Sequence, residues 1–310
     1  PPPPPYPVHL LGEDGVMRNL WCFAVVLAAA SVAAAQDMPL TQVILPGEGW
    51  QLVAMDCSST AGLVGDGRGN VYVADPDGRQ LWRIDKDGKA ALFTKTVGCV
   101  HGLAVAPDGR LFAGEPEMER VLVYDESGKE VARHEGLAVS DLVMTKSGDC
   151  YCTVPDEKAV FLLGADGQKR KVAGDFLLPG ALTLWNDGGT LVVADAGDKY
   201  MVAFRVQKNG DLDARERYYP FRVRPKEASE NAGLMLDAAG RAYATSREGV
   251  QVFDPTGRLS GVLVAPERAP LAGVAFGGAD LDRLYVACGG KVYVRKTLAK
   301  GVKAAEKKGS

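Results

Sequence analysis

The sequence lacks the short motifs that mark many enzymes and nucleotide-binding proteins. It contains no Gly-x-Ser-x-Gly, no His-Glu-x-x-His, no Cys-x-x-Cys and no phosphate-binding glycine loop. No nucleophile elbow, zinc site or nucleotide site is therefore indicated. The net charge is −3, and no Lys/Arg block occurs before the C-terminal end. We expect no nucleic-acid partner.

Long apolar runs are also missing, apart from a short one near the N-terminus. From Met17 the chain reads MRNLWCFAVVLAAASVAAAQ, with one positive charge and a small-residue run that ends at Ala35. This pattern predicts a secretory signal peptide over residues 17–35, because the apolar part is short for the alternative, a membrane anchor. The proline-rich residues 1–16 are interpreted as an over-extended reading frame. We expect a secreted or periplasmic protein with no membrane attachment after cleavage.

Cysteine is infrequent, and the number that remains after the expected signal peptide is odd, so the cysteines cannot all form disulfides with one another. Of six cysteines, Cys22 lies in the expected signal peptide, which leaves five. A disulfide between Cys57 and Cys99 is one alternative. Buried free thiols are the preferred interpretation.

The sequence is rich in a repeated strand pattern. In residues 100–129, VHGLAVAPDGRLFAGEPEMERVLVYDESGK, three apolar runs alternate with Pro-Asp-Gly and Ser-Gly turns, which indicates three antiparallel strands. The pattern begins six times, at Gly62, Gly102, Asp141, Ala181, Gly233 and Gly273. Most spacings are about forty residues, the length of a four-stranded blade. The sequence therefore predicts an all-β fold, a six-bladed β-propeller.

The two ends of the repeat complement each other. The last unit, residues 273–296, has only three strand-like runs, while residues 41–54 have strand character ahead of the first unit. We expect the N-terminal strand to complete the last blade and close the ring, which removes two sheet edges. The propeller is thus predicted over residues 40–296, followed by a flexible basic tail over residues 297–310.

Strand direction predicts which loops meet at one mouth of the central channel. The innermost strand of each unit starts at this mouth, and the second strand returns to it. Acidic residues end three of these second strands: Asp75, Glu115 and Asp195. We expect any functional site at this mouth.

Three runs resemble a known family. They are LTLWNDGGTLVVADAGDKYMVAFRVQKNGDL (182–212), GLMLDAAGRAYATSREGVQVFDPTGRL (233–259) and GVAFGGADLDRLYVACGGKVY (273–293). These runs are similar to the gluconolactonase, regucalcin and luciferin-regenerating enzyme-like family, and the resemblance covers residues 50–296. It implies a six-bladed propeller whose relatives bind one divalent cation at the channel mouth and hydrolyse sugar lactones or related esters.

The resemblance places the family's metal ligands, a Glu, two Asn and an Asp, at positions where this chain has other residues. By register these positions are Ala61, Ser140, Gly180 and Ala232. Hard divalent cations need several oxygen ligands, so we expect no metal and no cofactor. The alternative is a slip of register to Glu230 or Asn231, which would reverse the face of the side chain.

Other groups at this mouth provide a different candidate site. Asp141 keeps the second residue of the family's Asn-Asp run, and His101 replaces the Asn of an Asn-Gly-Leu run. With Glu115 they form the candidate catalytic set, either as acid/base groups or as a relocated metal site. The competing interpretation is structural, because Asp residues such as Asp75 and Asp195 commonly organise turns.

Three functions are compatible with these patterns. The first is a pseudoenzyme that has lost the family's metal site and binds a small molecule or a protein partner at the channel mouth. The second is a metal-dependent lactone or ester hydrolase with a relocated site around His101, Glu115 and Asp141. The third is a structural interaction module, favoured if the polar, aromatic insertion at residues 218–230 caps the mouth.

Overall fold

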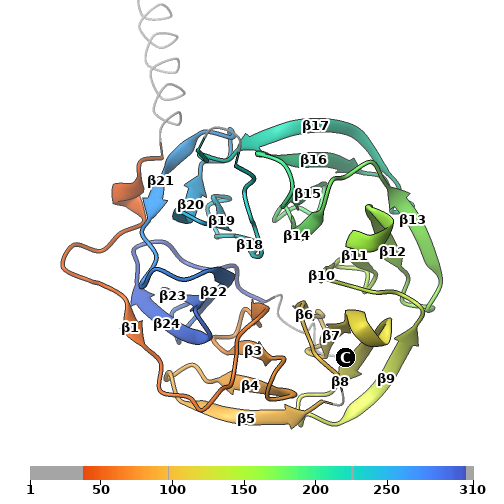
Figure 1. Ribbon diagram of the computed structural model, residues 1–310, viewed down its shortest axis with the longest axis horizontal. Coiled ribbons are helices and arrows are strands. Elements are labelled where there is room, and N and C mark those ends of the chain that lie inside the picture. The colour runs from red at the N-terminus through yellow and green to blue at the C-terminus, as the bar shows by residue number, and fades with distance from the viewer. Residues whose placement is uncertain (1–37, 97, 225–226, 305–310) are drawn as a thin grey trace, which may run out of the picture. The chain divides into compact units, whose positions relative to one another are not determined.

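The alternating apolar runs fold into six antiparallel sheets of four strands each, arranged in a ring (Figure 1). The computed structural model describes residues 38–96, 98–224 and 227–304. The expected leader and signal peptide lie outside these ranges. The predicted all-β, six-bladed propeller is confirmed. None of the helices within the described ranges has the length and apolar character required to span a bilayer.

The first three blades follow one another in the chain, each from its innermost strand outward. Blade 1 comprises β2 (Leu63–Gly65), β3 (Val71–Asp75), β4 (Gln80–Ile84) and β5 (Ala90–Lys95). Blade 2 comprises β6 (Leu103–Val105), β7 (Leu111–Glu115), β8 (Arg120–Tyr124) and β9 (Glu130–Glu135). Blade 3 comprises β10 (Asp141–Met144), β11 (Cys150–Val154), β12 (Ala159–Leu163) and β13 (Lys169–Ala173).

The remaining blades keep the same order until the last strand. Blade 4 comprises β14 (Pro179–Leu184), β15 (Thr190–Asp195), β16 (Tyr200–Val206) and β17 (Leu212–Pro220). Blade 5 comprises β18 (Leu234–Leu236), β19 (Ala242–Ser246), β20 (Gly249–Phe253) and β21 (Leu259–Leu263). Blade 6 comprises β22 (Leu271–Gly277), β23 (Arg283–Cys288), β24 (Lys291–Lys296) and β1 (Gln51–Leu52). Short 3-10 helices are η2 (Leu40–Gln42), η3 (Pro116–Met118) and η4 (Pro155–Glu157).

The N-terminal strand closes the ring, as predicted. In β1, Gln51 is opposite Val294 and Leu52 is opposite Tyr293 of β24. Figure 1 shows this red-orange strand as the outer edge of the blue blade. The outermost strand of blade 6 therefore comes from the other end of the propeller, and the two ends hold each other in place.

The core lies between neighbouring blades. All residues of β3, β7, β11 and β19 are buried, because each second strand is covered on both faces by the adjacent sheets. Tyr151 and Val160 of blade 3, for example, pack in one cluster with Leu191 and Val193 of blade 4. Each fully buried aliphatic or aromatic side chain of this kind contributes about 1.5–3 kcal/mol. These contacts fix the innermost strands, which line the channel.

Residues 297–304 do not form the flexible tail that their composition predicted. Thr297 and Ala299 are buried, Gly301 forms a β-bridge with Asp237, and the N–H of Ala304 donates to the carbonyl oxygen of Gly67 at 3.0 Å. Backbone hydrogen bonds and the packing of small residues hold this segment in place. Its sequence has no period-two apolar run, so the strand pattern did not predict this. We call it the C-terminal strap; it crosses the channel end that lies opposite the predicted mouth. Residues 305–310 lie outside the described ranges.

Candidate functional site

The starts of the six innermost strands pack closely around the channel. We call this ring the collar, and its residues are Gly62, Gly102, Asp141, Ala181, Gly233 and Gly273. A Cβ atom on Gly102 would lie 2.6 Å from the Cα of Asp141, and one on Gly233 would lie 2.8 Å from the Cα of Gly273. The N–H of Gly62 donates to the carbonyl oxygen of His101 at 2.8 Å. Side chains are excluded at these contacts, which explains why most collar residues are glycine or alanine.

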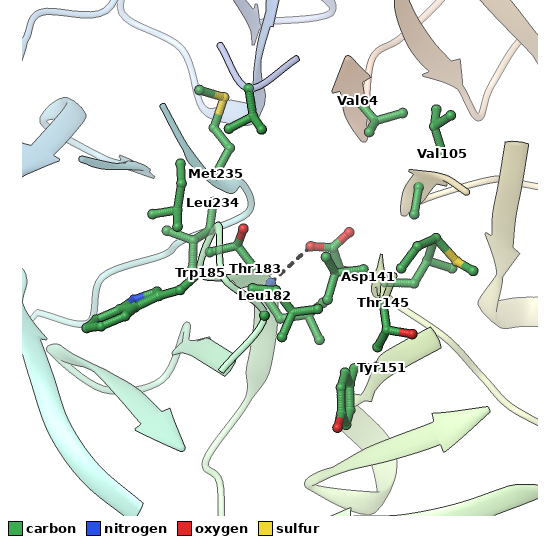
Figure 2. A pocket seen from close by; sticks show the side chains of 18 of the residues that line it. Val64, Val105, Asp141, Thr145, Tyr151, Leu182, Thr183, Trp185, Leu234 and Met235 are labelled. Carbon is green, nitrogen blue, oxygen red and sulfur yellow. Dashed lines mark hydrogen bonds between the residues drawn. The ribbon is translucent and has the colours of Figure 1, made fainter. Parts of the chain in front are cut away.

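Asp141 is the exception in the collar. Its Oδ2 atom accepts a hydrogen bond from the N–H of Leu182 in blade 4 at 3.1 Å, the dashed line in Figure 2. Its own N–H donates to Oγ1 of Thr153 at 3.1 Å. Burial raises the pKa of Asp141 to about 7, and the amide hydrogen bonds from Leu182 and Leu142 only partly oppose that rise. The carboxyl group can therefore accept or donate a proton near neutral pH.

A cavity of about 710 Å³ begins at the collar and extends toward the opposite face. Near Asp141 its lining is mainly apolar and comes from the innermost strands: Val64, Val105, Val143, Leu184, Leu234 and Met235. Figure 2 shows Val64, Val105, Thr145, Thr183 and Met235 around the same space as Asp141. Asp141 is the only ionisable lining residue at the collar end among the described residues. An apolar pocket with one convergent polar group is typical of a small-molecule site.

Sequence reasoning placed the site at the strand starts and missed this lining. Of the residues predicted at the mouth, Asp141 and Ala232 line the cavity; Ala61, His101, Ser140, Gly180, Asp75, Glu115 and Asp195 do not. The available signal is the apolar alternation along the innermost strands, which serves equally for packing and for lining a channel. The cavity therefore extends deeper into the channel than the strand starts named from the sequence.

Asp75 and Asp195 organise turns. Asp75 accepts hydrogen bonds from the N–H groups of Ser58, Ser59 and Gly78 at 2.9–3.0 Å. Asp195 has the same role in blade 4, where the N–H groups of Leu177, Leu178 and Gly197 donate to it at 2.7–3.1 Å. Each carboxylate fixes the loop that leads into the first strand of its own blade.

Glu115 and His101, the other two members of the candidate catalytic set, do not share the cavity with Asp141. Glu115 is fully buried; its Oε1 accepts the N–H of Gly98 at 3.0 Å and its Oε2 accepts Nε–H of Arg120 at 2.5 Å. The His101 residue is exposed, and its backbone N–H donates to the carbonyl oxygen of Gly114 at 2.9 Å. Neither side chain lines the cavity beside Asp141.

The residues present do not fit the cation of the family. The ligand positions hold a methyl, a hydroxyl or a hydrogen, and a Cβ on Gly180 would lie 2.9 Å from the carbonyl oxygen of Asn231. After a register slip, Asn231 would offer one oxygen; its Nδ2 donates to the carbonyls of Gly233 and Thr245, while its buried Oδ1 has no partner among the described residues. Glu230 forms an ion pair with Arg247 at 3.4 Å. No group of three His, Cys, Asp or Glu side chains suited to a metal ion exists within the described ranges.

The insertion after β17 lies at the junction of blades 4 and 5. Phe221 packs against Phe253 with ring centroids 6.1 Å apart, and Arg222 exchanges two backbone hydrogen bonds with the Gln251 side chain. The Oγ of Ser229 donates to the carbonyl oxygen of Asp195 at 3.2 Å. No described residue from 218 to 230 lines the cavity.

The cysteines of the described chain are free thiols. Cys57 and Cys99 are partly buried and unbridged, and Cys150, Cys152 and Cys288 are buried. The Sγ atoms of Cys150 and Cys152 lie 3.7 Å apart on one face of β11. The preferred interpretation, buried free thiols, is confirmed for Cys150, Cys152 and Cys288, whereas Cys57 and Cys99 are free but only partly buried.

The sequence match to a protein family is consistent with this fold. Residues 103–289, more than half of the chain, match the family described as SMP-30/Gluconolactonase/LRE-like region. The chain belongs to this family. Pentonolactonase XacC of Haloferax volcanii is 26% identical to it over 230 residues, which cover 71% of this chain and 77% of that protein.

Solved structures share the propeller fold of this SMP-30/gluconolactonase family member. A gluconolactonase from Xanthomonas campestris has a TM-score of 0.70 at 21% identity, covering 82% of this chain and 91% of that one. A regucalcin from Agrobacterium tumefaciens, described as a calcium-binding protein, has a TM-score of 0.67 at 15% identity, covering 83% of this chain and 96% of that one. At these identities the likeness shows the fold alone.

Proposed function

We propose that this family member binds a small, largely apolar molecule in its central cavity without a divalent cation, and that Asp141 is the polar anchor. One observation carries the proposal. The other five collar positions hold glycine or alanine, whereas the collar position of blade 3 holds Asp141, whose carboxyl group lies at the end of an apolar cavity. With a pKa of about 7, this group is a hydrogen-bond donor or acceptor for a ligand near neutral pH.

Two measurements on the purified mature protein test this function. Elemental analysis, followed by calorimetric titration with calcium, magnesium, manganese and zinc salts, is expected to find no stoichiometric ion and no binding heat at millimolar metal. Ligand-observed NMR with a library of small apolar alcohols and lactones is expected to find binders that Val105→Phe, which fills the cavity, removes. One tightly bound ion per chain, or binders unaffected by Val105→Phe, would overturn the proposal.

The pKa of Asp141 favours a second candidate, the hydrolysis of an apolar lactone. Asp141 would take a proton from water as the resulting hydroxide forms a bond to the lactone carbonyl carbon. The ring C–O bond then breaks, and the ring oxygen receives the proton, which yields a hydroxy acid. The names of the relatives, pentonolactonase and gluconolactonase, support this reaction class.

The two candidates are distinguished by turnover. With δ-dodecalactone as substrate, hydrolysis predicts a rate that rises with pH through about 7 and falls at least about a hundredfold in Asp141→Asn, the loss of a general base. Binding alone predicts no turnover above that of buffer. Turnover that is unchanged in Asp141→Asn would exclude Asp141 as the base.

A further inference from the structure

The cavity has a solvent-exposed end, and it lies opposite the collar. The exposed lining residues are almost all in turns of blades 3 and 4 at that end: Lys146, Ser147, Asn186, Asp187, Lys208 and Asn209. At the collar, Ala232 is the one exposed lining residue in the part of the chain that the structure describes. The broader opening therefore lies between the turns of blades 3 and 4.

The C-terminal strap covers another part of the same end. Gly301 and Val302 line the cavity. The N–H of Ala238 in blade 5 donates to the carbonyl oxygen of Lys300 at 2.8 Å, and the N–H of Ala304 donates to Gly67 of blade 1 at 3.0 Å. The strap thus spans blades 5, 6 and 1, and none of the described residues after Lys296 forms a hydrogen bond with the turns of blades 3 and 4 that line the opening.

Two ammonium groups stand at this opening. Nζ of Lys146 donates to the carbonyl oxygens of Asn186 at 3.1 Å and of Asp187 at 3.5 Å, and it has no carboxylate partner among the described residues. Lys208 is exposed and likewise forms no ion pair within the described ranges. Both groups keep donors available for an anionic ligand.

The carboxylates at the opening are already occupied by their own turns. Asp149 accepts the N–H of Ala165 at 3.0 Å and the hydroxyl of Ser147 at 2.8 Å. Asp187 accepts the N–H of Gly189 at 2.8 Å. The carboxylates at the opening thus hold their own turns, whereas Lys146 and Lys208 have no charged partner among the described residues.

We propose that the cavity is loaded from this opening and takes an amphiphilic carboxylate, with an apolar body inside and the carboxylate at Lys146 and Lys208. The inference rests on the proposed function, because it assumes binding in the cavity. From Asp141 to Met144, β10 advances roughly 10 Å at about 3.3 Å per residue, and Lys146 lies in the turn that follows. An extended alkyl chain as long as that of dodecanoate covers this strand and reaches the turn, and a polar group at its far end would meet Asp141.

Calorimetric titration of the purified protein tests the head group. The probes are dodecanoate and dodecyltrimethylammonium, which share the alkyl chain and differ in the sign of the charge, both below their critical micelle concentrations. We expect one dodecanoate per chain and at least tenfold weaker binding of the cation. The double variant Lys146→Ala/Lys208→Ala is expected to weaken dodecanoate binding about three- to tenfold, the effect of two exposed charge contacts.

Two control variants separate this inference from the proposed function. Lys129→Ala removes an exposed lysine on the same face that does not line the cavity, and it is expected to change nothing. Val105→Phe, checked for folding by circular dichroism, is expected to abolish binding of both probes. Equal affinity for the two probes, or no loss in the lysine double variant, overturns the carboxylate inference. If Val105→Phe still removes binding in that case, cavity binding stands; if Val105→Phe has no effect, both fail.

Discussion

The carboxylate of Asp141 in blade 3 accepts a hydrogen bond from the backbone N–H of Leu182 in blade 4, 3.1 Å away. Blades 1 and 2 are joined at the collar by backbone alone and in the opposite direction, from the N–H of Gly62 in blade 1 to the carbonyl oxygen of His101 in blade 2. Between blades 3 and 4 a side chain therefore takes part in the contact. It places one titratable group at the end of the cavity.

This arrangement predicts a pH-dependent cost in stability. The pKa of Asp141 is raised from 3.8 to about 7 in the folded protein, so the native state holds a proton that the unfolded state has lost between these values. The contribution of Asp141 to the free energy of unfolding is therefore fully present below about pH 4, decreases up to about pH 7 and is constant above. At roughly 1.4 kcal/mol per pKa unit it amounts to at most about 4 kcal/mol, and solvent in the cavity reduces it.

Asp141→Asn isolates this contribution. Asparagine keeps an acceptor for the N–H of Leu182 and carries no charge, so the variant is expected to exceed the parent in stability at pH 8 and to match it near pH 4. Urea unfolding at pH 4.5, 6 and 8 measures the difference. A difference that does not change with pH would contradict the raised pKa.

Glu115 is expected to act on stability alone. Glu115→Gln leaves the buried guanidinium of Arg120, 2.5 Å from the carboxylate in the parent, without its charge partner. We expect a loss of about 3 kcal/mol in the free energy of unfolding. The double variant Glu115→Gln/Arg120→Met is expected to recover part of it. Ligand binding per folded molecule is expected to stay unchanged, and a selective loss of binding at full stability would return Glu115 to the site.

The sequence was sufficient for the architecture because each blade repeats its own signal. The six strand starts from Gly62 to Gly273 and the closing strand within residues 41–54 follow from period-two runs and turn residues, which are local features. The turn role of Asp75 and Asp195, the competing interpretation for these residues, is also local, and their hydrogen bonds to loop N–H groups confirm it. Local patterns were adequate wherever the contact lies within one blade.

The site depends on contacts between blades, and these leave weaker signals. His101 follows from the register as a residue at a strand start, yet the register does not tell whether its side chain turns into the channel. The strap has no strand period, because backbone bridges to Asp237 and Gly67 hold it. Asp141 stands out in the sequence because it keeps the second residue of the family's Asn-Asp run. Val105 and Met235 do not stand out, because they obey the apolar pattern.

The collar predicts a strong intolerance of side chains at Gly102. In Gly102→Ala, the new Cβ would lie 2.6 Å from both the Cα of Asp141 and the carbonyl oxygen of Ser140. Backbone atoms of a packed ring cannot move aside cheaply, so we expect a loss of about 2 kcal/mol or more. Gly49→Ala is the matched control, because nothing lies within 4 Å of its Cβ position. Thermal unfolding measures both, and equal Tm values would mean that the collar is looser than the structure indicates.

The strap predicts different outcomes for two shortened chains. A chain that ends at Lys296 loses the buried Thr297 and Ala299 and the bonds from Ala238 and Ala304, so we expect a clear fall in Tm. A chain that ends at Ala304 keeps every one of these contacts and serves as the control. The first chain is also expected to admit dodecanoate faster in stopped-flow experiments, because the end of the cavity is less covered. Faster uptake with an unchanged Tm would show that the strap limits access without stabilising the ring, whereas unchanged uptake and Tm would contradict its packing against blades 5 and 1.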